Sequence, residues 1–181
     1  AKESIVNNCS VKLKFTNAMR AIDQPNTSFL RTSNNASLNR IWLSLNQGTQ
    51  LKRNIAIGFG ENLSDTYGMG DTPRFDSATD TDFYSLIAGH DLGFAVQFLS
   101  TFNIEKTVPL GMEVFQSGMY QIQLEQTDGI FNQGQSIYLE DTYQDIIHDL
   151  GTSPYTFTQS AGTNINDRFI LRFTNSALGN E

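Results

Sequence analysis

The chain has 181 residues, of which 39% are hydrophobic, 11% aromatic and 17% charged. This length suits one domain that buries roughly two thirds of its unfolded surface. The 13 Phe and 6 Tyr exclude a disordered chain, because disordered chains lack the aromatic residues that build a core. A net charge of −7 without a cluster of Lys or Arg argues against nucleic acid as a partner. No apolar run approaches the roughly 20 residues of a membrane-spanning helix, so we expect no membrane insertion.

Alternating apolar and polar residues recur along the chain and predict β-strands with one side turned to a core. The first such segment is 9–16, in which Cys9 shares the parity of the apolar residues. We interpret Cys9 as a buried core residue, because a single cysteine forms no internal disulfide. The later inward-facing residues are expected to be Ile41, Leu43 and Leu45; Ile55, Ile57 and Phe59; Phe94, Val96 and Phe98; Tyr120, Ile122 and Leu124; Tyr155 and Phe157; and Phe169, Leu171 and Phe173. Arg168 and Arg172 alternate with the last three and are expected on the water-facing side.

Turn-forming Asn, Asp, Gly, Ser and Pro residues separate these segments. The stretch 139–150 has the best helical pattern, but its aromatic and β-branched residues favour a hairpin that turns at 141–145. The chain is therefore predicted to be all-β, an antiparallel and jelly-roll-like β-sandwich of about 8–11 short strands. We expect residues 1–181 to form one module, and the alternative is a division into two subdomains, 1–35 and 36–181.

Two histidines are the first candidates for catalysis. His90 and His148 each precede an Asp, and such pairs could serve a catalytic triad or share a metal ion. The sequence contains neither a Gly-x-Ser-x-Gly elbow nor a His-Glu-x-x-His motif. We therefore predict a protein without catalytic residues or a cofactor, and interpret both histidines as surface or turn residues.

The most acidic segment of the chain is 71–82. Its carboxylates are Asp71, Asp76, Asp80 and Asp82. Calcium takes six to eight oxygen ligands, which such a segment could supply in part. The EF-hand spacing is absent, however, and Arg74 adds a competing cation. A solvated acidic loop is the favoured interpretation, and a structural calcium site is the alternative.

A glycine-rich loop of roughly residues 60–82 is longer than most connections without secondary structure, and such loops often bind partners. It contains Tyr67. Trp42 and Tyr138 oppose the core parity of their strands, and exposed aromatic side chains on a sheet suit stacking on sugars. The alternative for both is packing beneath a covering loop.

Several phrases occur together in a recognisable order. They are Asn39-Arg40-Ile41-Trp42-Leu43-Ser44-Leu45, Thr81-Asp82-Phe83-Tyr84-Ser85, Val108-Pro109-Leu110-Gly111, Ile137-Tyr138-Leu139-Glu140-Asp141, Gly151-Thr152-Ser153-Pro154-Tyr155-Thr156-Phe157-Thr158, Ala161-Gly162-Thr163 and Asn166-Asp167-Arg168-Phe169-Ile170-Leu171-Arg172-Phe173-Thr174. In this order they resemble the C-terminal region of Bacteroidetes proteins exported by the type IX secretion system, of the kind labelled type C sorting domains. The resemblance covers residues 28–178.

The resemblance implies a non-catalytic β-rich module at the end of a large secreted protein, such as a surface adhesin or a polysaccharide-degrading enzyme. It implies that outer-membrane translocon components of the type IX system are partners, and that the protein reaches the cell surface or the medium. Family members commonly carry the signal in a short segment after a stretch like Leu171-Arg172-Phe173-Thr174. The resemblance therefore leaves open whether this chain holds the signal or the folded module before it. The alternative function is a carbohydrate-binding or adhesion module with a surface polysaccharide as its ligand.

Overall fold

The computed structural model describes residues 38–75 and 80–175, which all belong to the unit spanning residues 36–181. In these ranges the chain forms an 11-stranded sheet and the short 3-10 helix η2 (Gly129–Gln133). The strands are β1 (Asn39–Gln47), β2 (Gln50–Phe59), β3 (Thr72–Pro73), β4 (Asp82–Leu86), β5 (Gly93–Leu99), β6 (Val108–Val114), β7 (Gly118–Asp128), β8 (Tyr138–Asp141), β9 (Ile146–Asp149), β10 (Tyr155–Gln159) and β11 (Thr163–Arg172). The all-β prediction is confirmed. The strand expected at 9–16, with Cys9, lies outside the described residues.

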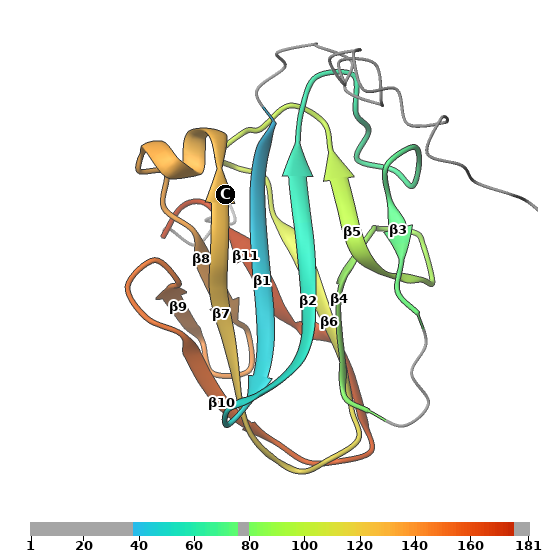
Figure 1. Cartoon of the computed structure of the whole chain (residues 1–181), viewed down its shortest axis with the longest axis vertical. Coiled ribbons are helices and arrows are strands. Elements are labelled where there is room, and N and C mark those ends of the chain that lie inside the picture. The colour runs from blue at the N-terminus through green and yellow to red at the C-terminus, as the bar shows by residue number, and fades with distance from the viewer. Residues whose placement is uncertain (1–37, 76–79, 176–181) are drawn as a thin grey trace, which may run out of the picture. The chain divides into compact units, whose positions relative to one another are not determined.

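The strands form one sheet in the order β10-β7-β1-β2-β5-β4-β6-β11-β8-β9, with β3 added to β5. The sheet curls into a near-barrel, so that the half from β10 to β5 lies in front of the half from β4 to β9 in Figure 1. All strand pairs are antiparallel except β2 and β5, which run parallel with Ala56 opposite Val96. The wholly antiparallel sheet expected from the sequence is therefore wrong at this junction. Because β3 and β4 lie between β2 and β5 in the chain, these two strands are joined by a long connection and not by a hairpin.

The core lies between the two halves of the sheet. The alternation of apolar and polar residues along the strands predicted most of the side chains that form it. Ile41, Leu43 and Leu45 on β1 are fully buried, and Leu43 lies opposite Ile55 on β2 and Leu124 on β7. The alternating apolar residues of β2, β7, β10 and β11 join the same core. Full burial of one such side chain contributes about 1.5–3 kcal/mol. The predicted alternation therefore accounts for the inner face of most of the sheet.

Four phenylalanines pack together in the core. Phe59 belongs to β2, Phe102 to the loop after β5, Phe131 to η2, and Phe173 directly follows β11. The ring centroid of Phe102 lies 5.4, 5.2 and 5.0 Å from those of Phe59, Phe131 and Phe173, each in an edge-to-face arrangement. Such pairs attract one another beyond the effect of their buried area. The rings thus fix η2 and the loop after β5 to the sheet.

Strand β5 departs from the predicted alternation. The core-facing residues expected there were Phe94, Val96 and Phe98. The structure instead turns Gln97 and Leu99 toward the core, with Gln97 opposite the inward-facing Ile57. The outer face of β5 lies beneath the β2–β3 loop (residues 60–71), which is why Phe94 is buried as well. When both faces of a strand are covered, apolar residues occupy both, and parity no longer identifies the core side.

Strands β8 and β9 form the hairpin that the sequence predicts for 139–150. The chain reverses over the four residues between them, where Gln144 N donates to Asp141 O at 3.2 Å and Asp145 has a φ of 54°. Asp is one of the few residues that tolerate such a positive φ. The prediction of a hairpin is confirmed. Whether residues 1–35 form a subdomain of their own stays a prediction, because these residues are outside the described part.

Candidate functional site

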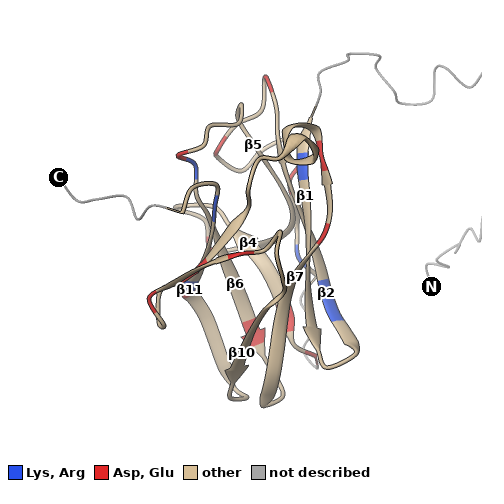
Figure 2. Cartoon of the chain, turned by 90° about the vertical axis from the view of Figure 1, so that its left-hand side faces the viewer, with Lys and Arg blue, Asp and Glu red and all other residues tan. Residues whose placement is uncertain are grey.

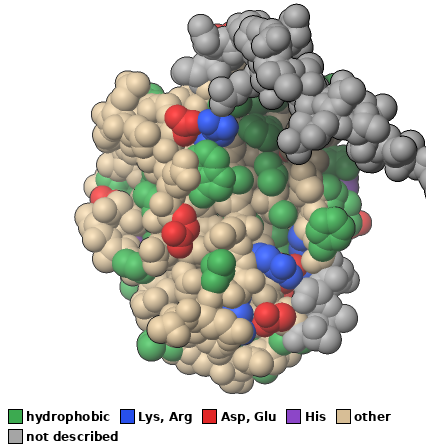
Figure 3. Space-filling model, in the orientation of Figure 1, with side chains coloured by type: hydrophobic (Ala, Val, Ile, Leu, Met, Phe, Trp, Pro, Cys, Tyr) green, Lys and Arg blue, Asp and Glu red, His purple; other side chains and the backbone are tan. Residues whose placement is uncertain are grey.

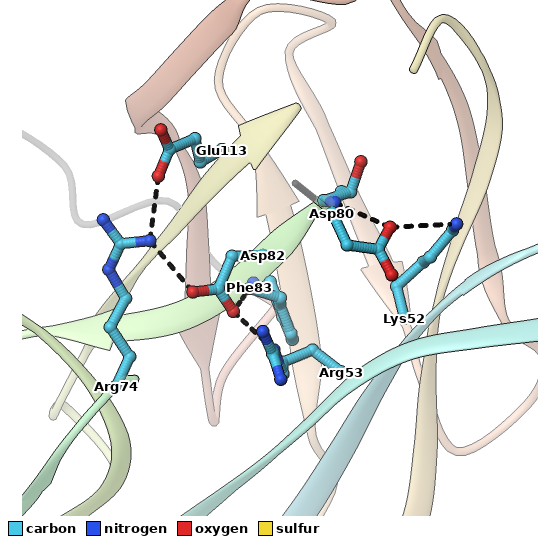
Figure 4. A network of polar contacts seen from close by, with 8 residues as sticks. Lys52, Arg53, Arg74, Asp80, Asp82, Phe83 and Glu113 are labelled. Carbon is cyan, nitrogen blue, oxygen red and sulfur yellow. Dashed lines mark hydrogen bonds and ion pairs between the residues drawn. The ribbon is translucent and has the colours of Figure 1, made fainter. Parts of the chain in front are cut away.

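A cluster of charged side chains surrounds Asp82 at the start of β4 (Figure 4). The Asp82 side chain is 1% exposed. Its Oδ1 accepts hydrogen bonds from Arg53 Nε at 2.7 Å and from Phe83 N at 2.9 Å, and its Oδ2 accepts one from Arg74 Nη1 at 2.9 Å. A buried charge needs partners of opposite sign and satisfied hydrogen bonds. Asp82 has both, so this carboxylate fixes β2 and the chain after β3 to β4.

Arg74 extends this cluster to a neighbouring strand. Its Nη1 also donates to Glu113 Oε2 on β6 at 2.9 Å, and its guanidinium lies 4.3 Å from the ring centroid of Tyr84. Burial by itself lowers the pKa of Arg74, but the hydrogen bonds to Asp82 and Glu113 outweigh it and raise the pKa above the ordinary value. A guanidinium that stays charged cannot transfer a proton. The cluster around Asp82 therefore holds strands together. Arg74 cannot act in it as a general acid or base.

The proposed calcium ligands do not converge in the described residues. Asp82 is engaged by two arginines, while Asp80 Oδ1 accepts from Lys52 Nζ at 3.1 Å. Asp71 lies in the β2–β3 loop and accepts hydrogen bonds from the backbone N–H groups of Gly68 in the loop and Phe98 on β5, and Asp76 lies outside the described residues. Within 38–75 and 80–175, no group of three His, Cys, Asp or Glu side chains could hold a metal ion.

A second charged cluster is buried where the two ends of the curled sheet meet. Arg168 Nε and Nη2 on β11 donate to the two oxygens of Asp141 on β8, at 2.9 and 2.6 Å, and Tyr155 Oη on β10 donates to Asp141 Oδ2 at 2.8 Å. Arg168 Nη1 also donates to Gln159 Oε1 on β10 at 3.0 Å. We call Asp141, Arg168 and Tyr155 the clasp. Because β10 begins the order of the sheet and β8 stands near its other end, the clasp joins the two ends.

The clasp alters the pKa of each of its members. Burial by itself raises the pKa of Asp141, but hydrogen bonds from Arg168 and Tyr155 and the charge of Arg168 outweigh it, so the net pKa lies below its ordinary value. Burial, followed by the hydrogen bond to Asp141, raises the pKa of Tyr155 to about 12. The expected water-facing position of Arg168 is wrong, because it lies within this cluster. Arg172 is also buried, and its Nη1 donates to Glu140 Oε2 at 2.8 Å.

The structure does not bring the two histidines together. His90, in the turn between β4 and β5, packs against Tyr67 and Phe94, with ring centroids 4.9 and 5.6 Å away. His148 lies on β9, four strands beyond β4 in the order of the sheet, and its Nε2 is 2.8 Å from Ser153 O. His148 Nε2 also lies 3.3 Å from Ser153 Oγ, a hydrogen bond of the kind that a nucleophile and a base share. His90 takes no part in this contact, so the two histidines do not form one shared site.

The three aromatic candidates lie in different parts of the unit. Trp42 is half-buried on the outer face of β1, and the guanidinium of Arg40 lies 5.3 Å from its ring centroid. Tyr138 is half-buried on β8, in the other half of the sheet (Figure 1). Tyr67 is 47% exposed in the β2–β3 loop. The three residues therefore do not form one sugar-binding platform.

Trp42 stands at one end of a row of small side chains on the outer face of the front half. The strand registers place Trp42 opposite Ala56 on β2, Ala56 opposite Val96 on β5, and Val96 opposite Thr72 on β3. Figure 3 shows this side of the unit, where uncharged polar side chains and backbone separate the hydrophobic side chains. Trp42 therefore has a small side chain beside it on β2 and Gln126 beside it on β7.

Two carboxylates hold the β2–β3 loop in place. Asp71 accepts hydrogen bonds from Phe98 N at 2.7 Å and from Gly68 N at 2.8 Å. Asp65 accepts from Ser100 N at 2.9 Å and from Lys106 Nζ at 2.7 Å. Figure 1 shows the loop leaving the end of β2 and descending beside β5 to β3. The loop therefore has a fixed path along β5 despite its length.

The β2–β3 loop encloses a hollow of about 140 Å³ against β5. Its lining consists of Asn62, Leu63, Ser64, Thr66, Gly68, Met69, Asp71 and Phe98. The Phe98 ring lies between two glycines, since a methyl group on Gly58 would stand 2.4 Å from Phe98 Cε1 and one on Gly70 would stand 2.9 Å from Cδ2. Sequence reasoning identified this loop as the first place to look for binding. It missed Phe98, which it assigned to the core.

Charged residues are spread over several strands and loops of the described part (Figure 2). No helix in the described ranges is both long enough and apolar enough to cross a membrane.

One protein family matches the chain. It is described as a domain of unknown function (DUF8693), and the match spans residues 3–173. No curated protein and no solved structure matches the chain.

Proposed function

The chain belongs to the DUF8693 family, a domain of unknown function. We propose that this member is a non-catalytic, export-associated C-terminal module of a type IX secretion system cargo protein. In this proposal the module is a β-sandwich of jelly-roll type with one parallel junction. It needs no cofactor, and outer-membrane translocon components of the type IX system are its partners. Its parent protein is delivered to the cell surface or the medium.

The observation that carries this proposal is the location of the phrases on which the type IX resemblance rests. Thr81–Ser85 falls in β4, Val108–Gly111 in β6, Asn166–Thr174 in β11 and Ile137–Asp141 in β8. These strands are consecutive neighbours in the order β4-β6-β11-β8. Four of the seven phrases thus lie on neighbouring strands of one half of the sheet, whereas 39–45 lies in β1 and 151–158 reaches into β10, in the other half. Phrases that are far apart in the sequence contribute strands to the same sheet, as expected of phrases that specify a common structural module.

The charged residues of these phrases support the same proposal. Asp82 is held by Arg53 and Arg74, and Asp141 by Arg168. Arg53 joins β2 to β4, Arg168 joins β11 to β8, and Arg74 joins the chain after β3 to β4. Each carboxylate is buried. A catalytic carboxylate must reach a reacting atom, whereas these two stabilise the arrangement of strands. A rigid unit of this kind suits the end of an exported protein.

An export assay tests the proposal. Residues 1–181 are fused behind a fluorescent cargo, with and without an appended type IX signal segment, in a host that carries this secretion system. Export of the appended fusion alone identifies the chain as the folded module before the signal. Export of the bare fusion means that the chain contains the signal. The cargo with the signal segment but without residues 1–181 is the control. If neither fusion containing the chain is exported, or if the module does not improve on that control, the proposal is wrong.

A second candidate function is carbohydrate binding or adhesion, with a surface polysaccharide as the ligand. The observation that favours it is the half-buried Trp42 beside the small side chains of Ala56 and Val96. An aromatic face with an open neighbouring surface can contact the apolar side of a sugar ring.

A glycan array tests this second function. The native protein, Trp42→Ala and Tyr138→Ala are compared, and Tyr138→Ala serves as the matched control because Tyr138 lies in the other half of the sheet. Loss of sugar binding in Trp42→Ala alone supports a site on the outer face. An array without any bound sugar excludes the function.

A further inference from the structure

We propose that the hollow inside the β2–β3 loop binds one neutral, polyhydroxylated ring, such as a single sugar unit of a glycan. This inference goes beyond the second candidate function, because it places a sugar at a site distinct from Trp42.

The hollow is formed before any ligand arrives. Asp71 is bonded to the backbone of β5 through Phe98 N, and Asp65 is bonded to Ser100 and Lys106 beyond the end of β5. Gly60 N also donates to Leu99 O at 3.1 Å. Because these contacts fix both parts of the loop against β5, a ligand would not have to order the loop. A site that needs no ordering retains more of its contact energy as affinity.

The lining combines an aromatic surface with hydroxyl, amide and carboxylate groups. Phe98 contributes a ring, while Asn62, Ser64, Thr66 and Asp71 contribute polar groups. A sugar ring has the matching pattern, with C–H groups on its face and hydroxyls around its rim. The carboxylate of Asp71 has about four acceptor positions, of which two receive the N–H groups of Phe98 and Gly68. The remaining positions can accept hydroxyl protons from a ligand.

Size and charge narrow the choice of ligand. The hollow of about 140 Å³ is smaller than the roughly 300–1,000 Å³ of a pocket for a drug-sized molecule, and it therefore fits one ring of a larger glycan. Asp71 accepts hydrogen bonds from the backbone N–H groups of Gly68 and Phe98, and Lys106 is already paired with Asp65. An anionic ring would face an unneutralised carboxylate, so a neutral sugar is favoured over a uronic acid.

The test is a titration followed by backbone amide NMR, with glucose, galactose, mannose, N-acetylglucosamine and glucuronate as separate probes. At least one neutral sugar should shift the amide signals of residues 62–71 and 98, and glucuronate should leave them in place. Asn62→Gly removes only the side chain, because Gly accepts the φ of 63° at this position. Loss of one hydrogen bond predicts about fivefold weaker binding in this variant. Trp42→Ala should bind as tightly as the native protein.

Each other outcome overturns the inference in a recognisable way. If no probe shifts any signal, the hollow fails, and the glycan array alone decides the second candidate function. If the shifts surround Trp42 and vanish in Trp42→Ala, the second function stands and the hollow fails. If glucuronate binds as tightly as glucose, or if Asn62→Gly binds as tightly as the native protein, the assigned lining is wrong. None of these results bears on the export assay, so the first proposed function is tested independently.

Discussion

The clasp and the β2–β3 loop both depend on aspartates, but the aspartates act in opposite settings. In the clasp, Asp141 is fully buried and a guanidinium binds both of its oxygens. In the β2–β3 loop, Asp71 binds backbone N–H groups at the surface, and Asp65 is half exposed beside Lys106. The buried charge joins three strands, whereas the surface carboxylates shape one loop. We therefore expect the clasp to determine the free energy of unfolding of the described unit, and the two surface aspartates to determine the conformation of the β2–β3 loop.

The largest expected effect is that of Asp141→Ala. Removing this carboxylate leaves the charge of Arg168 buried without its bidentate partner, which destabilises a protein by about 3–5 kcal/mol. Urea unfolding measures the change in the free energy of unfolding. The control is Asp167→Ala, because Asp167 is exposed and its carboxylate accepts from Tyr143 Oη. A loss for Asp141→Ala as small as that for the control would contradict the role of the clasp.

The next effect is that of Tyr155→Phe, which removes the hydroxyl that donates to Asp141. A hydrogen bond to a charged group contributes about 1.5–3 kcal/mol, so this variant should be destabilised by that amount at neutral pH. The same urea experiment measures it. Because the phenyl ring is retained, a much larger loss would mean that packing of the ring, and not the hydroxyl, supports the clasp.

The pH dependence of the same variant sharpens the result. The pKa of Tyr155 is raised to about 12, whereas an unfolded tyrosine has a pKa of about 10. Its contribution is therefore complete below about pH 10 and is lost as the pH rises toward 12. Asp141 has a lowered pKa, so its contribution is lost in acid, as the pH falls below about 4. Across pH 9 to 12, stability of the native protein should fall more steeply than that of Tyr155→Phe. Parallel curves would refute this assignment.

In the second region, Gly58→Ala should disturb the β2–β3 loop. The added methyl would collide with the Phe98 ring, and overpacking of this kind costs about 1–3 kcal/mol. A double-mutant cycle tests the cause, because Gly58→Ala should cost much less when Phe98→Ala has removed the ring. Equal costs in the two backgrounds would show that the glycine is required for a different reason.

The smallest expected effect is that of Asp65→Asn. Burial raises the pKa of Asp65, but hydrogen bonds from Lys106 and Ser100 outweigh it and lower the pKa overall. Because the side chain is half exposed, loss of its charge should cost less than about 1 kcal/mol. The difference from the native protein should shrink further in 1 M salt, which screens exposed charges. A loss comparable to that of Asp141→Ala would remove the distinction between the two regions.

The sequence predicted the strands whose two faces differ in environment. The alternation around Ile41, Leu43 and Leu45 identified a core face, and the residues between Leu139 and Leu150 gave the correct hairpin. The alternation of residues led to a wrong prediction for β5, because the β2–β3 loop covers the outer side of this strand. Phe98 is apolar because it lies beneath that loop, and it does not belong to the core. Local sequence contains no signal for such a cover.

The charged residues were harder to predict for a related reason. Arg168 was expected to face water because it alternates with Phe169, yet its partner Asp141 lies 27 positions earlier in the chain. Parity describes one strand, whereas an ion pair depends on which strands become neighbours. The β2–β3 loop was indicated as a candidate for binding by its glycines and its length. Its hollow could not be predicted, because it requires the position of Phe98 on β5.

The pairing of β1 has a consequence for how the protein is made. Strand β2 follows β1 directly, but β7, its neighbour on the other side, lies about 80 residues further along. At a synthesis rate of about 5–20 residues per second, β7 leaves the ribosome about 4–16 s after β1. During this interval the nascent β1–β2 hairpin has an exposed apolar face and an unpaired strand edge, through which it can associate with other chains. Chaperones that shield emerging polypeptides are therefore expected to increase its yield.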